Sequence, residues 1–387
     1  MSLTDLTAEE INHSGRLAGV IGLRMLGLFL VLPVLVLMAE SMPGYTPALA
    51  GLAVGIYGLS QAVLQQPFGH LSDRLGRRKV MIMGLLLFIA GSVVAALANH
   101  MLVLVAGRML QGCGAIAGVA LAFAADRVHA DRRASAMAII GMSIGASFLV
   151  SIMLSVPLAN LFGLSGLFWL TAILGALGLA VVAGMSEPTH RPEVVSQDRR
   201  PIAGIGLLSA SVFLLHALLT AVFVVLPGEM HRSFGVALAD HWKIYVPAML
   251  VSALLVFPVL RKIAAMRLQH AVLPWGFVGL SIALVLFATA KSSSWLLPGY
   301  LVFFLAFNLL EAAMPSMVAG LAGAAGRGGR MGIYTTWQFL GAFVGGSMAG
   351  LMLGQAGASR SLMILGLVSI AWAWVFRLRA KTLAAAI

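Results

Sequence analysis

Long apolar stretches, each ended by a short polar or glycine-rich segment, repeat along the whole chain. A helix needs about 20 apolar residues to cross the hydrocarbon core of a bilayer, whereas a membrane β-barrel shows alternating segments of about ten residues. No such alternation is visible. The pattern therefore predicts an all-α membrane protein with about twelve transmembrane helices. The predicted spans are residues 16–39, 47–71, 78–98, 101–127, 133–159, 166–186, 203–227, 243–262, 270–290, 294–321, 330–354 and 358–378.

Composition supports the same fold class. Of the 387 residues, 60% are hydrophobic and 10% are charged, with a mean hydropathy of +1.00, whereas soluble domains carry about 25% charged residues. The single cysteine, Cys113, excludes an intrachain disulfide and a metal site built from several thiolates. It is expected to be a small packing residue. The N-terminus has no basic region followed by a cleavage site, so no signal peptide is predicted.

The net charge of +12 comes from basic residues that gather in alternate loops, which favours membrane orientation over nucleic-acid binding. The positive-inside rule places the basic-rich loops in the cytoplasm. Both termini are then cytoplasmic and the number of spans is even. The basic-rich loops contain Arg74, Arg77, Arg78 and Lys79; Arg127, Arg132 and Arg133; Arg191, Arg199 and Arg200; Arg261, Lys262 and Arg267; Arg327 and Arg330; and Arg377, Arg379 and Lys381.

The chain divides into two halves of similar pattern. We predict an N-terminal six-helix bundle over residues 1–186, a cytoplasmic linker over 187–201 and a C-terminal six-helix bundle over 202–387. The first span of each half ends alike, in Val31-Leu32-Pro33 and in Val225-Leu226-Pro227. Two bundles of six helices around a central site form a transporter architecture.

A motif follows the second predicted span. The sequence "GHLSDRLGRRK" (69–79) matches the signature G-x-L-[SA]-D-R-x-G-R-[RK], and the chain thereby resembles the major facilitator superfamily. The alternative is ordinary cytoplasmic loop charge, which would not fix this order of residues. The resemblance implies that Asp73 contacts the N-terminal end of the eleventh helix and that Arg77 reaches toward Asp126. The conformational motif comprises Gly69, Asp73, Arg74, Gly76, Arg77, Arg78 and Asp126.

Two further family patterns give unequal support. The stretch "RMLQGCGA", with Arg108, Gln111 and Gly112, resembles the fourth-helix motif that is linked to proton transfer in proton-coupled members. The alternative role for Arg108 is pairing with helix carbonyls. On the fifth helix, "GMSIGASFLV" (141–150) keeps two glycines of the antiporter signature but lacks its proline and glycine pair. This departure weakens an inference to antiport.

The sequence resembles the YajR-like branch of drug/proton efflux transporters over nearly the whole chain. The resemblance implies a multi-pass protein of the bacterial inner membrane. That branch carries a soluble C-terminal domain, whereas this chain ends at Ile387. The matching stretches are "LRMLGLFLVLPVL" (23–35), "GIYGLSQAVLQQPFGHLSDRLGRRK" (55–79), "GRMLQGCGAIAG" (107–118) and "FNLLEAAMPS" (307–316).

One carboxylate lies well inside a predicted span. Glu311 interrupts "FFLAFNLLEAAMPS", and a charge at the bilayer centre costs at least about 2.5 kcal/mol. Desolvation favours the neutral form of a carboxylate, so Glu311 is a candidate proton carrier. The alternative is a protonated residue that only packs. His216, on the seventh span, is the second candidate because histidine titrates near physiological pH. The resemblance extends to both positions.

A cavity between the bundles is expected to be polar at a few positions and apolar elsewhere. Arg24 lies eight residues inside the first span, which is deep for snorkelling, and a fixed positive charge there would attract anions. Asn308 and the break at Pro315 suggest a non-ideal helix that lines the cavity. The predicted cavity residues are Arg24, Tyr57, Gln61, Phe304, Asn308 and Trp337.

These observations predict a secondary active transporter, acting as a monomer on a small molecule, with protons and the lipid bilayer as its other partners and no cofactor. Proton-coupled efflux of an amphiphilic compound is favoured. The alternative is proton-coupled import of a metabolite or of a metal ion such as copper, suggested by 21 methionines and His216. Thr220 stands where a His-x-x-x-Met spacing would need methionine. A membrane receptor or enzyme is disfavoured, because no nucleophile, metal cluster or phosphate-binding loop is visible.

Overall fold

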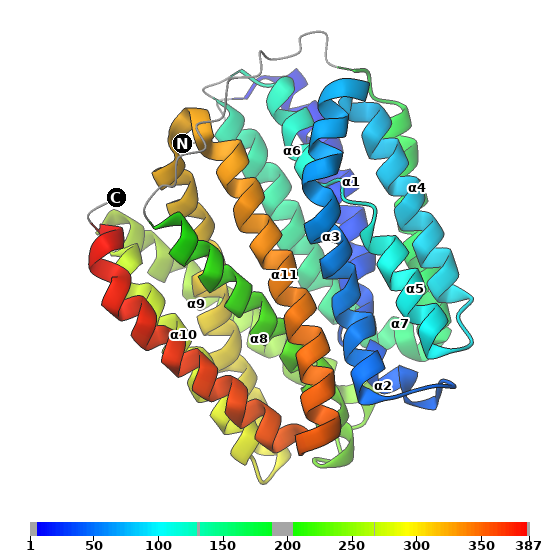
Figure 1. Cartoon of the computed structure of the whole chain (residues 1–387), viewed down its shortest axis with the longest axis vertical. Coiled ribbons are helices and arrows are strands. Elements are labelled where there is room, and N and C mark those ends of the chain that lie inside the picture. Colours follow the sequence, from blue (N-terminus) through cyan, green and yellow to red (C-terminus); the bar gives the residue numbers. More distant parts are fainter. Residues whose placement is uncertain (1–5, 130–131, 188–203, 267, 385–387) are drawn as a thin grey trace. The chain divides into compact units, whose positions relative to one another are not determined.

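The computed structural model describes residues 6–129, 132–187, 204–266 and 268–384 (Figure 1). The predicted linker, 187–201, lies outside the described residues apart from Glu187. Every regular element in the described ranges is helical. The α-helices are α1 (Ala8–Val31), α2 (Leu35–Met38), α3 (Pro47–Leu75), α4 (Arg77–Ala96), α5 (Met101–Gly112), α6 (Ala117–Asp126), α7 (Arg133–Ala183), α8 (Ile205–Arg232), α9 (Trp242–Ala265), α10 (Gln269–Thr289) and α11 (Leu296–Ala384), with short 3₁₀ turns at Ala39–Ser41, Leu238–Asp240 and Ser293–Trp295.

The helices form two compact units. Unit 1 contains residues 1–45 and 56–194, and unit 2 contains residues 46–55 and 195–387. Helix α3 therefore begins in unit 2 and continues in unit 1, which the hydrophobic pattern does not anticipate.

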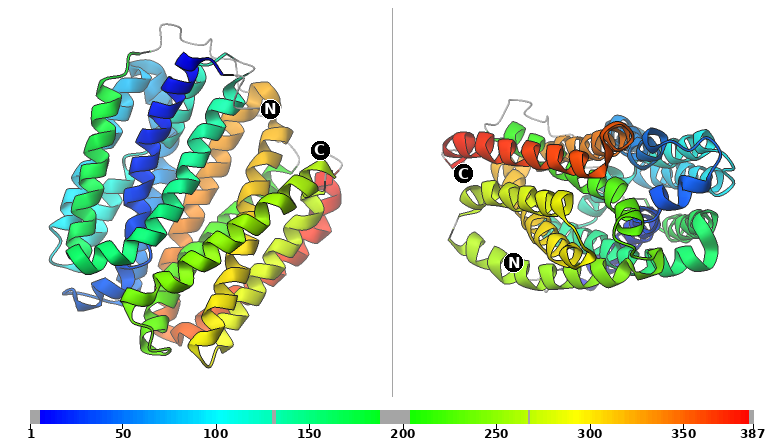
Figure 2. Two further views of the ribbon diagram at one scale, coloured as in Figure 1. Left: turned by 180° about the vertical axis from the view of Figure 1, so that it is seen from behind. Right: turned by 90° about the horizontal axis from the view of Figure 1, so that it is seen from below.

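Unit 1 is held together by α1 and α7, which lie side by side (Figure 2). Helix α1 begins at a capping box in which the Thr7 hydroxyl accepts from the Glu10 amide and the Glu10 carboxylate accepts from the Thr7 amide. Hydroxyls of α7 then donate to backbone carbonyls of α1 at four-residue intervals along both helices. Ser147, Ser151 and Ser155 bond Gly22, Leu26 and Leu30 at 2.8, 2.9 and 2.5 Å. Small polar residues bind membrane helices together in this way, because they permit close approach and leave no polar group unpaired.

Unit 2 packs α8, α9 and α10 against α11 (Figure 1). Glycines allow the contact with α8 to be close. A Cβ at Gly341 would lie 2.0 Å from the carbonyl oxygen of Phe213, and one at Gly345 would lie 2.1 Å from that of Ala217. On the α10 side, Ser281 donates to the Gly366 carbonyl at 2.8 Å.

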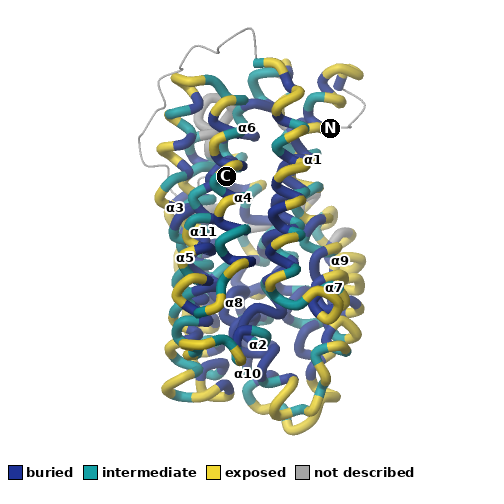
Figure 3. Tube along the Cα trace, turned by 90° about the vertical axis from the view of Figure 1, so that its right-hand side faces the viewer, coloured by how far each residue is buried: buried dark blue, intermediate teal, exposed yellow. Residues whose placement is uncertain are grey.

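Exposed residues occur along the helices (Figure 3), and many of them have large apolar side chains. Leu254, Trp374 and Leu367 keep 74%, 64% and 60% of their surface exposed. Exposed large apolar side chains in such number are unusual on a soluble protein and are typical of a surface that contacts the membrane. The outer surface therefore suits lipid rather than water.

Ten helical segments are long and apolar enough to cross a membrane in the described part of the chain. Two of them are about twice as long as one crossing requires: Ser135–Ala183 has 49 residues and Gly329–Arg379 has 51. Each contains a glycine with left-handed φ, +67° at Gly163 and +76° at Gly357. Such a residue interrupts a right-handed helix.

Two predicted spans are also interrupted. The span predicted at 16–39 breaks after Val31, where Pro33 follows, and the span predicted at 101–127 breaks at residues 113–116 between α5 and α6. Hydropathy does not reveal these breaks because the interrupting residues are themselves apolar or small. The second break frees backbone carbonyls inside unit 1, as described below.

We predict that Gly341→Ala destabilises the protein because its methyl group would overlap the Phe213 carbonyl. Overpacking of this kind costs about 1–3 kcal/mol, so the melting temperature in detergent should fall. Gly332→Ala on the same helix is the matched control, because a Cβ added there would have no other atom within 4 Å. That substitution should leave stability equal or slightly higher. Equal melting temperatures for the two variants would refute the close packing of α8 on α11.

Candidate transport site

His216 is fixed in the middle of α8 by its neighbours. Its Nδ1 lies 3.2 Å from the carbonyl of Val212, one turn earlier, and its ring meets the edge of Phe307 with centroids 5.8 Å apart. The Thr220 hydroxyl donates to the His216 carbonyl at 2.8 Å. The bond to Val212 assigns the ring proton to Nδ1, so Nε2 is left as an acceptor in the neutral ring.

Gln338 of α11 connects His216 with Glu311. Its Nε2 lies 2.7 Å from His216 Nε2 and donates to Glu311 Oε1 at 3.3 Å. One amide group thus supplies a proton to the imidazole and a proton to the carboxylate. The second carboxylate oxygen, Oε2, lies 3.7 Å from His216 Nε2 and has no hydrogen-bond partner among the described residues. The Glu311 side chain retains 35% exposure, against 13% for His216.

This geometry allows a proton to be exchanged without dismantling the cluster. Gln338 occupies only Oε1, so Oε2 can gain or lose a proton while the amide bonds remain. Protonation of His216 on Nε2 would instead displace the Gln338 amide proton, and the resulting cation would face Glu311 Oε2 as an ion pair. Tyr334, one turn before Gln338, is buried.

A series of aromatic rings packs against the His216 side of this cluster. Phe307 stacks with Phe303, which meets Phe304, and Phe304 stacks with Tyr300. Such offset and edge contacts add stability beyond area burial and hold the His216 ring in place. Of the predicted cavity residues in unit 2, Phe304 is fully buried in this stack, Asn308 donates to Ser252 Oγ at 2.8 Å, and Trp337 is 41% exposed.

Unit 1 contains a buried arginine in α1. Nη2 of Arg24 donates to the Tyr57 hydroxyl at 2.6 Å and to the Gly114 carbonyl at 2.9 Å, inside the break between α5 and α6. The guanidinium carbon of Arg108 lies 5.2 Å from the centroid of the Tyr57 ring. Gln61 donates to the freed carbonyl of Gly112 at 2.7 Å. The helix break thus supplies carbonyl acceptors that an unbroken helix would have kept for itself.

The fourth-helix motif is linked to α4 through side chains. Arg108 donates to Gln111 Oε1, and Gln111 Nε2 donates to Ser92 Oγ at 2.9 Å. Gly107 and Gly91 permit this approach, because added Cβ atoms would meet Ala95 and Gln111 backbone nitrogens at 2.6 and 2.1 Å. Arg108 is thus tied to a polar side chain as well as to the Tyr57 ring.

The loop of the conformational motif forms an ion-pair cluster at the end of α3 and the start of α4. Arg77 Nε donates to Asp126 Oδ2 at 2.9 Å, which is the contact that the family resemblance implies. Arg77 Nη1 lies 2.5 Å from Asp73 Oδ1 and donates to Ser72 Oγ at 2.6 Å. The turn needs glycine at position 76, where φ is +102°. The expected contact of Asp73 with the eleventh helix stays a prediction.

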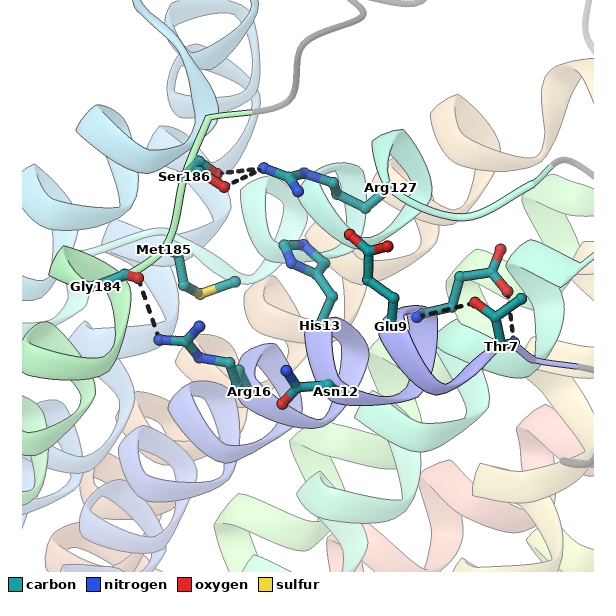
Figure 4. A pocket seen from close by; sticks show the side chains of 10 residues that line it. Thr7, Glu9, Asn12, His13, Arg16, Arg127, Gly184, Met185 and Ser186 are labelled. Atoms are coloured by element: carbon teal, nitrogen blue, oxygen red, sulfur yellow. Dashed lines mark hydrogen bonds between the residues drawn. The ribbon is translucent and has the colours of Figure 1, made fainter.

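Arginines of unit 1 also hold the residues that follow α7 (Figure 4). Arg16 donates to the Gly184 carbonyl at 3.3 Å, and Arg127 donates to Ser186 Oγ at 2.7 Å and to the Glu187 carbonyl at 2.9 Å. The Glu187 carboxylate accepts from the Arg78 amide at 3.0 Å. These bonds border a pocket of about 490 Å³ lined by Thr7, Glu9, Glu10, Asn12, His13, Arg16, Arg127, Gly184, Met185 and Ser186. These hydrogen bonds hold the residues that lead from α7 into the linker.

The sequence over residues 17–268 matches the Major Facilitator Superfamily. It is 36% identical to the inner membrane transport protein YajR of Escherichia coli (strain K12), over 95% of this chain and 83% of that protein. The chain belongs to the major facilitator superfamily. It is also 31% identical to multidrug resistance protein MdtL of Escherichia coli O81 (strain ED1a), over 45% of this chain and 44% of that protein.

The fold is also found in solved transporter structures. A bacterial homologue of the human lysosomal transporter Spinster, solved in an inward-facing, unoccupied conformation, superposes with a TM-score of 0.78 at 14% identity, over 98% of this chain and 99% of that one. At this identity the likeness shows the fold alone. The protein is therefore a multi-pass membrane transporter and not an enzyme, as the sequence predicts.

The geometry of the described residues gives little support to the alternative of metal import. No group of three or more histidine, cysteine, aspartate or glutamate residues that could hold a metal occurs among the described residues. A Met-x-x-x-Met spacing is present at Met348 and Met352 in α11, and Met348 is 48% exposed. Neither methionine belongs to the cluster of His216.

Sequence reasoning missed Gln338. The residue interrupts an apolar span, just as Glu311 does, but a neutral amide in a helix is less conspicuous than a charge. The backbone carbonyl of Gly114 was also missed, because no pattern of side chains predicts which helix breaks expose which carbonyls. Both became visible only through their distances to His216 and Arg24.

We predict that Arg77 and Asp126 are energetically coupled. Their side chains retain only 15% and 8% exposure, so removing one partner leaves a poorly solvated charge. Arg77→Gln and Asp126→Asn should each lower the melting temperature, and the double variant should lose less than the sum, with a coupling energy of about 0.5–3 kcal/mol. The measurement is a double-mutant cycle by unfolding in detergent.

Asp73→Asn is the matched control, because that carboxylate is 46% exposed and exposed pairs contribute little. It should change stability by less than either of the other substitutions. Additive losses for Arg77→Gln and Asp126→Asn would show that the pair contributes nothing beyond loop charge.

Proposed function

We propose that this protein is a proton-coupled efflux transporter for an amphiphilic small molecule. The observation that carries the proposal is the cluster of His216, Gln338 and Glu311, in which one amide bridges the two titratable side chains of unit 2. The chain has no phosphate-binding loop, so transport takes its energy from a gradient. The relative MdtL supports efflux as the direction, since it is named a multidrug resistance protein.

Proton exchange takes place at Glu311 Oε2. When this oxygen is protonated, the carboxyl group is neutral and its desolvation cost falls. When the proton leaves, the remaining negative charge is stabilised by the Gln338 amide on Oε1 and by His216 once that ring is protonated. The neutral and the ionised form of Glu311 therefore differ in how strongly the cluster needs to be hydrated. That difference can bias a transporter between states open to opposite sides of the membrane.

A transporter that works by alternating access must also close its site toward one side of the membrane while the site is open to the other side. The pairs of Arg77 with Asp73 and Asp126 fix the motif loop of unit 1, and we propose that this loop stabilises one of the access states. The alternative is that the charges of this loop only set the orientation of the protein in the membrane, and it predicts that Asp73→Asn does not change transport flux. We expect that variant to be expressed and to transport more slowly than the natural protein.

Twelve crossings complete the proposal. The two long candidate spans, of 49 and 51 residues, each count as two when divided at Gly163 and Gly357. The total then rises from ten to twelve, with both termini in the cytoplasm by the positive-inside rule. A single chain contains both six-helix bundles, 1–186 and 202–387, so a monomer is sufficient for transport.

We predict that Glu311→Gln keeps the fold but abolishes transport driven by a pH gradient. Glutamine preserves the size of the side chain and can still bond Gln338, but it cannot exchange a proton. The measurement is substrate-dependent proton flux in proteoliposomes loaded with a pH-sensitive dye and screened against a panel of amphiphiles. Flux should fall at least tenfold, while exchange of substrate at equal pH on both sides persists.

Glu229→Gln is the matched control, because Glu229 is the other carboxylate of α8 and α11 in the described ranges and bonds Ser233 instead of the cluster. It should transport normally. Proton-coupled flux of natural size in Glu311→Gln would show that Glu311 only packs, and His216→Gln would then be tested in the same assay.

The topology is tested by single cysteines in a Cys113→Ser background. Leu161 and Gln355 flank the two left-handed glycines and are both exposed. Leu161→Cys and Gln355→Cys should react with a membrane-impermeant maleimide from outside the cell, whereas Lys79→Cys should react only after the membrane is opened. Protection of either of the first two sites in intact cells would rule out twelve crossings.

A further inference from the structure

Arg24 is the largest fully buried side chain of the described residues, and its charge is not matched. The guanidinium uses both Nη2 protons, on the Tyr57 hydroxyl and the Gly114 carbonyl. Nε and Nη1 have no hydrogen-bond acceptor in the described part of the chain. Because an arginine has five N–H donors, three remain without a protein partner.

No carboxylate offsets this charge in the ion pairs of the described ranges. The acidic side chains of unit 1 that form such pairs do so elsewhere: Glu10 with Arg132, and Asp73 and Asp126 with Arg77. The groups around Arg24 are a phenol, a carbonyl and aromatic rings, with its guanidinium carbon 5.3 Å from the Phe88 centroid and 5.8 Å from the Tyr57 centroid. Ring faces weakly stabilise a cation, but they cannot supply an acceptor for an N–H group.

An arginine cannot remove its buried positive charge by losing a proton. A buried lysine or glutamate can become neutral, whereas the guanidinium stays charged at any physiological pH. A buried cation without a counter-ion costs several kcal/mol. The transporter therefore keeps a costly charge, which is the usual mark of a functional group inside a membrane.

The surroundings extend the positive region. Arg108 faces the same Tyr57 ring, so two guanidinium groups flank one phenol. Their combined potential favours an anion over a neutral or cationic compound. The rings of Tyr57 and Phe88 supply apolar surface beside the free N–H groups, which suits a molecule with an apolar body and one charged group.

We propose that Arg24 binds the anionic group of the transported compound, and that the substrate is an amphiphilic organic acid. The inference rests on the proposed transport function and names its substrate class. Nη1 donates to an oxygen of the carboxylate, while Nη2 remains on Tyr57 and Gly114. Since Arg24 is fully enclosed in this structure, the acid enters in another state of the alternating-access cycle.

The test is a binding assay on the purified protein, which needs no proton gradient. Matched pairs of acid and amide are added in detergent at neutral pH: octanoate with octanamide, decanoate with decanamide, 1-naphthoate with 1-naphthamide, and indole-3-acetate with its amide. We expect at least one acid to raise the melting temperature more than its amide does. Titration of that acid should then show at least a tenfold weaker affinity for Arg24→Gln.

Two variants control for charge and for folding. Arg16→Gln removes an exposed arginine from the same helix and should bind the acid as the natural protein does. Arg24→Lys keeps the charge but has fewer donors, so it should bind with intermediate affinity even where Arg24→Gln folds poorly. Tyr57→Phe frees one more Arg24 donor and should bind at least as tightly.

The proposal fails where no acid exceeds its amide, or where Arg24→Gln and Arg24→Lys bind the acid as well as the natural protein does. Its failure can be distinguished from that of the proton-coupling proposal. Glu311→Gln should bind the acid normally here while losing proton-driven flux in liposomes. Normal flux in Glu311→Gln together with acid binding that depends on Arg24 would overturn the coupling site and leave the substrate class standing.

Discussion

The cost of an unpaired polar group in hydrocarbon governs this structure. A backbone amide or carbonyl that water cannot reach must find a partner in the protein, and a charged side chain needs more than one. The serine hydroxyls of α7 that bond carbonyls of α1 and the glycines that bring α11 onto α8 are responses to this constraint. They replace the hydrophobic driving force, which is weak between helices already surrounded by lipid.

The same constraint separates structural polar groups from functional ones. Ser151 and Ser155 satisfy helix carbonyls and have no charge to accommodate. Glu311 Oε2 and three N–H protons of Arg24 have no protein partner in the described residues, although both side chains lie within spans. Neutral side chains also leave single polar atoms unpaired, but only a charged group at this depth bears a large desolvation cost. For Glu311 we infer that the partner is a proton, and for Arg24 an anion.

Under these proposals, the two units divide the tasks of proton exchange and anion binding. Unit 2 contains the carboxylate, the imidazole and the amide that joins them, whereas unit 1 contains the buried guanidinium groups and the loop of the conformational motif. The proposed proton site, with its titratable carboxylate, and the proposed anion site, with its permanent positive charge, thus belong to different helical units. An exporter of organic acids requires both kinds of charge, since one must bind the substrate anion while the other exchanges a proton.

The sequence by itself determined the membrane class, the family and the loop motif, because hydropathy and the order of residues 69–79 are properties of the chain. It also singled out Glu311, His216 and Arg24, since an ionisable residue in an apolar span is conspicuous in one dimension. Only the tertiary structure joined them to partners. Gln338 lies 122 positions from His216 and the Gly114 carbonyl 90 positions from Arg24, and no periodicity along a helix specifies which residues meet across helices. The breaks at residues 113–116 and at Gly163 were likewise decided by packing and backbone conformation, because apolar and small residues interrupt a helix there without interrupting its hydropathy.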